Sequence, residues 1–92
     1  MLLRIQSVKS ETGDKSNATI YNNIRDGLFT KSVQIGKRAV GWPAHEVKAI
    51  CAARIAGKSE VEIKELVKEL HIRRTQLFEE VLKRSTGAGG SL

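Results

Sequence analysis

The sequence has few of the residues that form covalent cross-links or metal-binding clusters. Its 92 residues include one cysteine and two histidines. A single cysteine excludes an internal disulfide framework and a multi-cysteine zinc site. His45 and His71 lie 26 positions apart with no acid or cysteine pattern around them. We therefore expect no metal ion, no other cofactor and a reducing, cytoplasmic compartment.

Long hydrophobic runs are also missing. No apolar stretch approaches the roughly 18 residues that a membrane span needs. The N-terminal segment MLLRIQSVKSE has no long apolar part and no small-residue cleavage site, so we expect no secretory signal and no membrane partner. Hydrophobic residues nevertheless make up 40% of the chain, which is enough for one small core.

Acidic residues are scarce in one part of the chain. The sequence holds 16 Lys and Arg against 10 Asp and Glu, a formal net charge of +6. Residues 1–42 contain seven basic and three acidic residues, whereas residues 59–92 contain six of each. A basic first part is what a polyanion-binding surface requires, although basic residues can also serve only to keep a small protein soluble.

The N-terminal segment predicts a short strand followed by a short helix. The apolar start over residues 2–5 suits a strand or a packed lead-in. Ser7 is placed to cap a helix over residues 8–12. Gly13 can end that helix in the left-handed conformation, which leaves residues 14–15 for a tight turn.

The next segment predicts a helix with one apolar and one polar face. Ser16 is a suitable N-cap for a helix over residues 17–26. Ile20 and Ile24 lie four positions apart and therefore share the buried face. At about 100° per residue, Asn22 points almost directly away from that face. The alternative is a plain amphipathic helix whose solvated face happens to be polar.

Alternating apolar and polar side chains over residues 30–42 predict a β-hairpin. Gly36 and Lys37 suit a two-residue turn of the Gly-first type. The tip of the hairpin is basic because it carries Lys37 and Arg38. We expect Trp42, at the end of the return strand, to lie in the core and lock the hairpin against the helices.

A third helix follows the hairpin. Pro43 suits its first turn, where the missing N–H is not needed, and Gly57 closes it. Spacings of three, four and eight give this helix an amphipathic stripe, on which we expect the cysteine to be a small buried hydrophobe. The stripe consists of Val47, Ile50, Cys51 and Ile55.

The C-terminal part predicts further helix. Ser59 and Glu62 form a capping box, and no glycine or proline lies between Ser59 and Thr86. Residues 59–84 therefore predict one long helix or two packed helices. We expect their apolar stripe either to complete the core of the preceding domain or to bind a second copy or another partner.

A third interpretation of this region is a second helix-turn-helix over residues 63–83. Residues 73–76 would then open its reading helix. The sequence beyond residue 85, TGAGGSL, is rich in glycine and predicts a flexible tail over residues 86–92.

The order helix, tight turn, helix and basic hairpin is the layout of a winged helix-turn-helix. Its second helix enters the major groove of DNA and its hairpin reaches the flanking backbone. An outward Asn22 can contact adenine, and Arg25 can contact guanine or a phosphate. Short polar side chains at a helix N-terminus suit a phosphate oxygen. The candidate DNA-binding residues are Lys15, Ser16, Asn17, Thr19, Tyr21, Asn22, Arg25, Lys31, Lys37 and Arg38.

Residues 18–47, ATIYNNIRDGLFTKSVQIGKRAVGWPAHEV, resemble the AlpA-type phage regulatory protein family. The resemblance extends over about residues 3–73, and the tryptophan-containing wing is its most distinctive part. It implies a MerR-like winged fold. It also implies a prophage or genomic-island transcription regulator, or an excisionase, which is a recombination directionality factor that bends attachment-site DNA for an integrase.

Together these observations predict a mainly α-helical fold with a small β-hairpin. We expect a winged helix-turn-helix over residues 1–57, a helical extension over residues 58–85 and the tail. The expected partner is double-stranded DNA, bound by a homodimer or a cooperative array because one unit covers only a few base pairs. The sequence offers no phosphate loop and no paired carboxylates, so we expect no enzyme. The competing function is a protein-interaction module, such as an anti-activator or adaptor, acting through its C-terminal helices.

Overall fold

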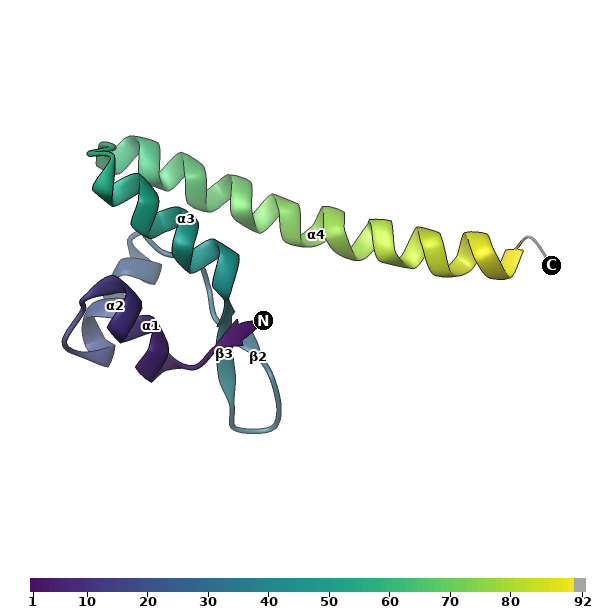
Figure 1. Cartoon of the computed structure of the whole chain (residues 1–92), viewed down its shortest axis with the longest axis horizontal. Helices are drawn as coiled ribbons and strands as arrows, with labels where there is room; N and C mark the ends of the chain where they lie inside the picture. The colour runs from purple at the N-terminus through teal and green to yellow at the C-terminus, as the bar shows by residue number, and fades with distance from the viewer. Residues whose placement is uncertain (91–92) are drawn as a thin grey trace.

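Helices dominate the architecture, and a short antiparallel sheet joins them (Figure 1). The computed structural model describes the backbone of residues 1–90 and the side chains of residues 1–85. One helix is much longer than the others and projects beyond the rest of the protein. The elements are β1 (Leu2–Leu3), α1 (Ile5–Thr12), α2 (Asn17–Arg25), β2 (Val33–Gln34), β3 (Val40–Pro43), α3 (Ala44–Ile55) and α4 (Glu60–Gly90).

The two short helices flank a turn, as the sequence predicts. Helix α1 begins earlier than expected, and the prediction that Ser7 caps it is wrong. The Val8 N–H donates to the Arg4 carbonyl at 3.0 Å, which makes Arg4 the N-cap. Gly13, with φ of 79°, ends the helix in the left-handed conformation. Ser16 caps α2 as predicted, because its Oγ accepts a hydrogen bond from the Thr19 N–H at 3.2 Å.

The sheet has three short strands in the order β1-β3-β2. The predicted hairpin is present, but its turn is longer than the expected two residues. The Ile35 N–H donates to the Ala39 carbonyl at 2.8 Å, so the loop consists of the three residues between them. Gly41, in the return strand β3, is buried; a Cβ there would lie 3.1 Å from the Leu3 carbonyl oxygen. The absence of a side chain thus lets the Leu3 backbone of β1 and the Ile35 side chain both lie close to Gly41.

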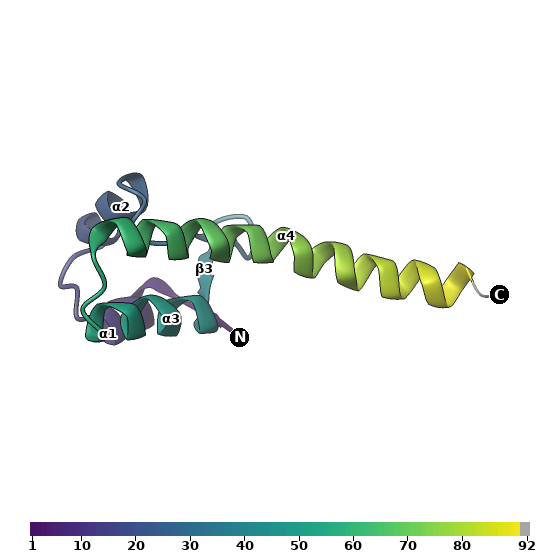
Figure 2. The same cartoon turned by 90° about the horizontal axis from the view of Figure 1, so that it is seen from above.

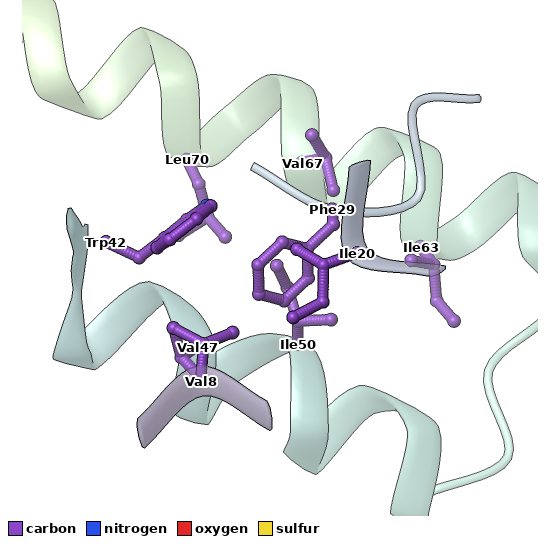
Figure 3. Close-up of a cluster of buried hydrophobic side chains, with 9 residues drawn as sticks. All are labelled: Val8, Ile20, Phe29, Trp42, Val47, Ile50, Ile63, Val67 and Leu70. Carbon is purple, nitrogen blue, oxygen red and sulfur yellow. The ribbon is translucent and has the colours of Figure 1, made fainter. Parts of the chain in front are cut away.

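The hydrophobic core lies among helices α1, α2, α3 and α4, and Trp42 of β3 closes it on one side (Figure 3). Trp42 and Phe29 are at most 2% exposed, and their ring centroids lie 6.4 Å apart. The Trp42 Nε1–H donates to the Thr30 carbonyl at 3.0 Å, so the buried indole has a polar partner. Ile55 does not belong to the core, contrary to prediction: it is 87% exposed because the last turn of α3 directs Ala53 and Arg54 toward the core and Ile55 toward solvent.

Helix α4 is continuous from Glu60 to Gly90, so the interpretations with two packed helices or a second helix-turn-helix are wrong. The capping box is confirmed, with the Glu62 N–H donating to Ser59 Oγ at 3.2 Å. The helix continues into the expected tail, because no proline stops its propagation. Positions 91–92 lie outside the described residues. Nowhere between residues 1 and 90 does a helix combine the length and apolar character needed to cross a bilayer.

One buried ion pair fixes α4 against the rest of the protein. Glu46 of α3 is 0% exposed, and Arg74 of α4 donates to both of its carboxylate oxygens, from Nε at 2.7 Å and from an NH2 group at 2.5 Å. The same NH2 group of Arg74 donates to the Lys31 carbonyl at 2.7 Å. One guanidinium therefore connects α3, α4 and the segment that leads into the hairpin.

Loss of this guanidinium should destabilise the protein far more than loss of its neighbour. Arg74→Ala leaves the Glu46 carboxylate buried without a counter-ion, and we expect the free energy of unfolding to fall by about 3–5 kcal/mol. Arg73→Ala removes an exposed i,i+4 pair with Glu69 and should cost less than about 1 kcal/mol. Urea unfolding followed by circular dichroism measures both; equal losses would contradict this account.

Candidate nucleic-acid interface

The polar face of α2 is exposed, in the orientation that the sequence predicts. Ile20 is 1% exposed and Ile24 is half-buried, so both point into the protein. Asn22 and Arg25 lie on the opposite side and are exposed. In Figure 2 the helix lies along one edge of the molecule, with α4 beside it and α1 and α3 beyond α4. Its outer surface is therefore open to a large partner.

The N-terminus of α2 holds several of the predicted phosphate contacts. Lys15 and Asn17 are exposed on either side of the N-cap. Ser16 and Thr19 are exposed as well, but their hydroxyls already bond each other at 2.9 Å, in addition to the backbone cap. The main task of this pair is to fix where α2 begins. Its capped first turn presents backbone N–H groups in the geometry that suits an anion.

Two further residues of α2 are partly committed to neighbours within the protein. Arg25 contacts Asp26 through Nε, at 3.3 Å from Oδ1, and both side chains are more than half exposed. This exposed pair is weak and engages one of the three guanidinium nitrogens. Tyr21 is 46% exposed, and its ring centroid lies 6.3 Å from that of Trp42. Its ring thus contributes to packing at the surface.

The hairpin carries its basic residues at its tip. Lys37 and Arg38 are both exposed. The side-chain amide of Gln34 donates to the Gly36 carbonyl at 3.0 Å, which stabilises the loop. Figure 1 shows the loop projecting from the sheet away from α4. No acidic side chain of residues 1–85 forms an ion pair with either of these cations.

Lys31, the third predicted wing residue, lies at the base of the hairpin and contacts α4 through its backbone. Its N–H donates to His71 Nε2 at 3.1 Å, and its carbonyl accepts from Arg74. The sequence analysis missed this connection, because the partners are 40 and 43 positions away and nothing local marks them. The Lys31 side chain itself is exposed.

His71 is a neutral hydrogen-bond acceptor in this arrangement. Desolvation by burial lowers the pKa of His71, and the nearby Arg74 guanidinium lowers it further. Glu46 acts in the opposite direction, and Lys31 adds a smaller lowering effect. A neutral ring keeps Nε2 free to accept the Lys31 N–H, whereas a protonated ring would offer only donors.

Two further kinds of side chain matter for chemistry, the possible metal ligands and the single thiol of Cys51. Within residues 1–85 no group of three His, Cys, Asp or Glu side chains is close enough to hold a metal ion. The Cys51 thiol is half-buried, lies 3.6 Å from the Glu11 carbonyl, and has a pKa that burial raises. A thiol with a raised pKa is a poor nucleophile.

A short helix-turn-helix followed by a β-hairpin with an exposed basic tip defines a winged helix-turn-helix protein. The profile of the family described as "Prophage CP4-57 regulatory protein (AlpA)" matches residues 1–55, which is more than half of the chain. The chain therefore belongs to the AlpA family of phage regulatory proteins. The matched region stops at the end of α3, short of the residue 73 that the resemblance suggested.

A curated relative comes from a phage. The chain is 43% identical over 56 residues to "Uncharacterized protein ORF88" of Enterobacteria phage P4. The match covers 61% of this chain and 62% of the relative, so less than two thirds of the relative's length is spanned. No solved structure matches the chain significantly.

Acidification should destabilise the protein through His71. Because its folded-state pKa lies below the ordinary value of about 6.5, the unfolded chain binds the proton first as the pH falls. The free energy of unfolding should therefore be highest above about pH 6.5 and should decrease as the pH falls through the folded-state pKa. Urea unfolding at a series of pH values between about 7 and 5 measures this.

The histidine responsible can be identified by substitution. His71→Gln should remove most of the decrease, whereas His45→Gln, at an exposed position of α3, should retain it. A decrease that survives in His71→Gln would show that another group is responsible.

Proposed function

We propose that this chain is a sequence-specific DNA-binding regulator that acts without catalysing a reaction. The observation that carries the proposal is the exposed polar face of α2, with Asn22 and Arg25 on it, together with the exposed basic tip of the following hairpin, Lys37 and Arg38. A helix with this face fits the major groove, and a basic loop fits the flanking phosphates. Membership of a phage regulatory family supports the same function.

The contacts divide by their chemistry. Asn22 and Arg25 read base edges, because amide and guanidinium groups can form two hydrogen bonds to adenine and guanine. The remaining candidates position the protein on the backbone and give the affinity its salt dependence. These phosphate contacts are Lys15, Ser16, Asn17, Thr19, Tyr21, Lys31, Lys37 and Arg38.

Within this function, two biological roles fit the family: transcription regulation in a prophage or genomic island, and excision as a recombination directionality factor. Both place the protein on DNA in the bacterial cytoplasm. The excision role adds an integrase as partner and requires binding at the attachment site. Binding at that site together with stimulation of excision by the purified integrase supports excision; binding confined to a promoter supports transcription regulation.

Substitutions in α2 and in the wing should have different effects on binding. Asn22→Ala should reduce discrimination at one base pair by about 1–3 kcal/mol. Lys37→Ala should weaken all duplexes alike and reduce the slope of log K against log salt by about one. Footprinting on the DNA that flanks the gene, with titrations at several salt concentrations, measures both effects.

Asn23→Ala is the matched control, since this neighbouring amide is half-buried on another side of α2. It should leave sequence discrimination unchanged. If neither Asn22→Ala nor Lys37→Ala alters the footprint, the surface assigned to DNA is wrong.

The projecting half of α4 supports a second proposal, on oligomeric state. Leu77, Phe78, Val81 and Leu82 are each at least 50% exposed and lie on one face. That face continues the stripe of Ile63, Val67 and Leu70, which packs against the core. Its side chains therefore project on the side of α4 that faces the winged domain.

We propose that a second copy of this chain covers this face with its own α4 in antiparallel orientation. A parallel pair would place both winged domains in the same space, whereas an antiparallel pair places them at opposite ends. The exposed stripe is continuous with a largely apolar pocket of about 670 Å³, whose lining includes Met1, Leu2, Pro43 and Leu77. A dimer also extends the DNA contact beyond the few base pairs of one unit.

Sedimentation of the free protein tests this pairing. The wild type should have twice the mass of the 10.1 kDa chain at micromolar concentration, and the Leu77→Glu/Phe78→Glu variant should be monomeric. Gln76→Glu, a matched control on another side of α4, should remain dimeric. A monomeric wild type would contradict the proposal and would favour a different protein as the occupant, as the interaction-module function requires.

A further inference from the structure

A second basic region lies between the C-terminal end of α2 and the first half of α4. The two elements enclose a cleft of about 340 Å³. Its floor is apolar and its rim is mainly basic. The residues that line it are Ile24, Arg25, Asp26, Gly27, Phe29, Lys31, Lys64, Val67, Lys68 and His71.

The three lysines of this cleft lack counter-ions. Its one acid, Asp26, contacts Arg25 at 3.3 Å. Lys31, Lys64 and Lys68 form no ion pair with any side chain among residues 1–85. Three ammonium groups without internal partners repel one another around a small cavity, an arrangement that an anion relieves.

The three arginines of α4 have acidic partners. Arg73 contacts Glu69 and Arg84 contacts Glu80, each as an i,i+4 pair, and Arg74 contacts the buried Glu46. The absence of such pairs at Lys64 and Lys68 is therefore a local feature of the helix face beside α2. Over α4 as a whole the charge is balanced, because residues 59–92 contain six basic and six acidic residues.

The position of Lys64 is set by the turn that ends α2. Gly27 has a φ of 78°, and a Cβ built on it would lie 3.7 Å from Lys64 Cγ, at van der Waals distance. The aliphatic part of Lys64 thus lies against the glycine turn, and Lys68 follows one helical turn later. On the other side, the Lys31 backbone is fixed by His71 and Arg74. Both walls of the cleft are therefore held in place by the fold.

We propose that this cleft binds one backbone phosphate of the DNA duplex that α2 contacts, held by Lys64 and Lys68 of α4 together with Lys31. The inference rests on the proposed DNA-binding function and deepens it. Arg25, already on the exposed face of α2, lines the same cleft and connects the two parts of the surface. A phosphodiester group carries a single negative charge, so it can serve as the counter-ion that the three unpaired lysines lack.

This assignment makes α4 part of the DNA interface. The family match ends at residue 55, so the two lysines lie wholly outside it. The first half of the C-terminal helix then has two functions. One face completes the core, and another face contacts the DNA backbone. The sequence signal is weak, since two lysines four residues apart on a helix are most often only solvated.

The salt dependence of DNA binding tests the proposal. In Lys64→Gln/Lys68→Gln, the slope of log K against log salt should fall by about 0.9, the value for one lost phosphate contact. Affinity for specific and non-specific duplexes should fall by the same factor. Lys48→Gln is the matched control: it removes an exposed lysine of α3, on the other side of α4 from α2 (Figure 2), and should leave the slope at the wild-type value.

The possible outcomes separate the two proposals. If the wild type binds DNA and the double variant has the slope of Lys48→Gln, the cleft proposal is wrong and the proposed function stands. If the wild type binds no DNA at any salt concentration, the proposed function itself fails.

A titration with inorganic phosphate tests whether the anion is a free phosphate and not a phosphate of DNA. The amide NMR signals of residues 64 and 68 report the binding. Phosphate-dependent shifts that the double variant abolishes, combined with an unchanged DNA slope, would identify a site for a free phosphate and overturn the assignment to DNA. A reduced slope supports the assignment whether or not free phosphate also binds.

Discussion

The buried contact between Arg74 and Glu46 is the interaction on which the arrangement of this protein depends. A fully buried carboxylate is stable only with a well-placed counter-ion, and here the counter-ion comes from another helix 28 positions away. The same guanidinium donates to the Lys31 carbonyl, and His71, one turn earlier, accepts the Lys31 N–H. Helix α3, helix α4 and the base of the wing are thereby held in one geometry.

This geometry has consequences on two faces of α4. Its first half lies beside α2, where Lys64 and Lys68 extend the basic surface of the winged domain. Its second half leaves the domain with Leu77 and Phe78 exposed. The proposed contacts with DNA and with a second copy therefore lie at different places along one continuous helix.

Local signals in the sequence predicted much of the local structure, although the predicted Ser7 cap and two-residue hairpin turn are wrong. The caps at Ser16 and Ser59 depend on side chains within three residues, and the outward direction of Asn22 follows from helix periodicity alone. Predictions that depend on tertiary packing were less successful. Ile55 has the spacing of a core residue, but in the last turn of α3 it is Ala53 and Arg54 that face the core, and Ile55 points to solvent.

The ion pair and the basic cleft lie beyond what one sequence can reveal. Glu46 has the pattern of an acidic residue in the first turn of a helix, a position that is usually solvated. Its burial depends on where α4 docks, and hence on residues far along the chain. The same is true of the cleft, which exists only because α4 passes beside the turn at Gly27.

The most direct test of the proposed DNA interface is an NMR titration of the wild-type protein with a duplex that it binds. Amide signals of Asn22, Arg25, Lys31, Lys64 and Lys68 should shift together at one affinity, while those on the outer face of α3 stay in place; shifts confined to residues 77–85, or the absence of shifts in α2, would contradict it.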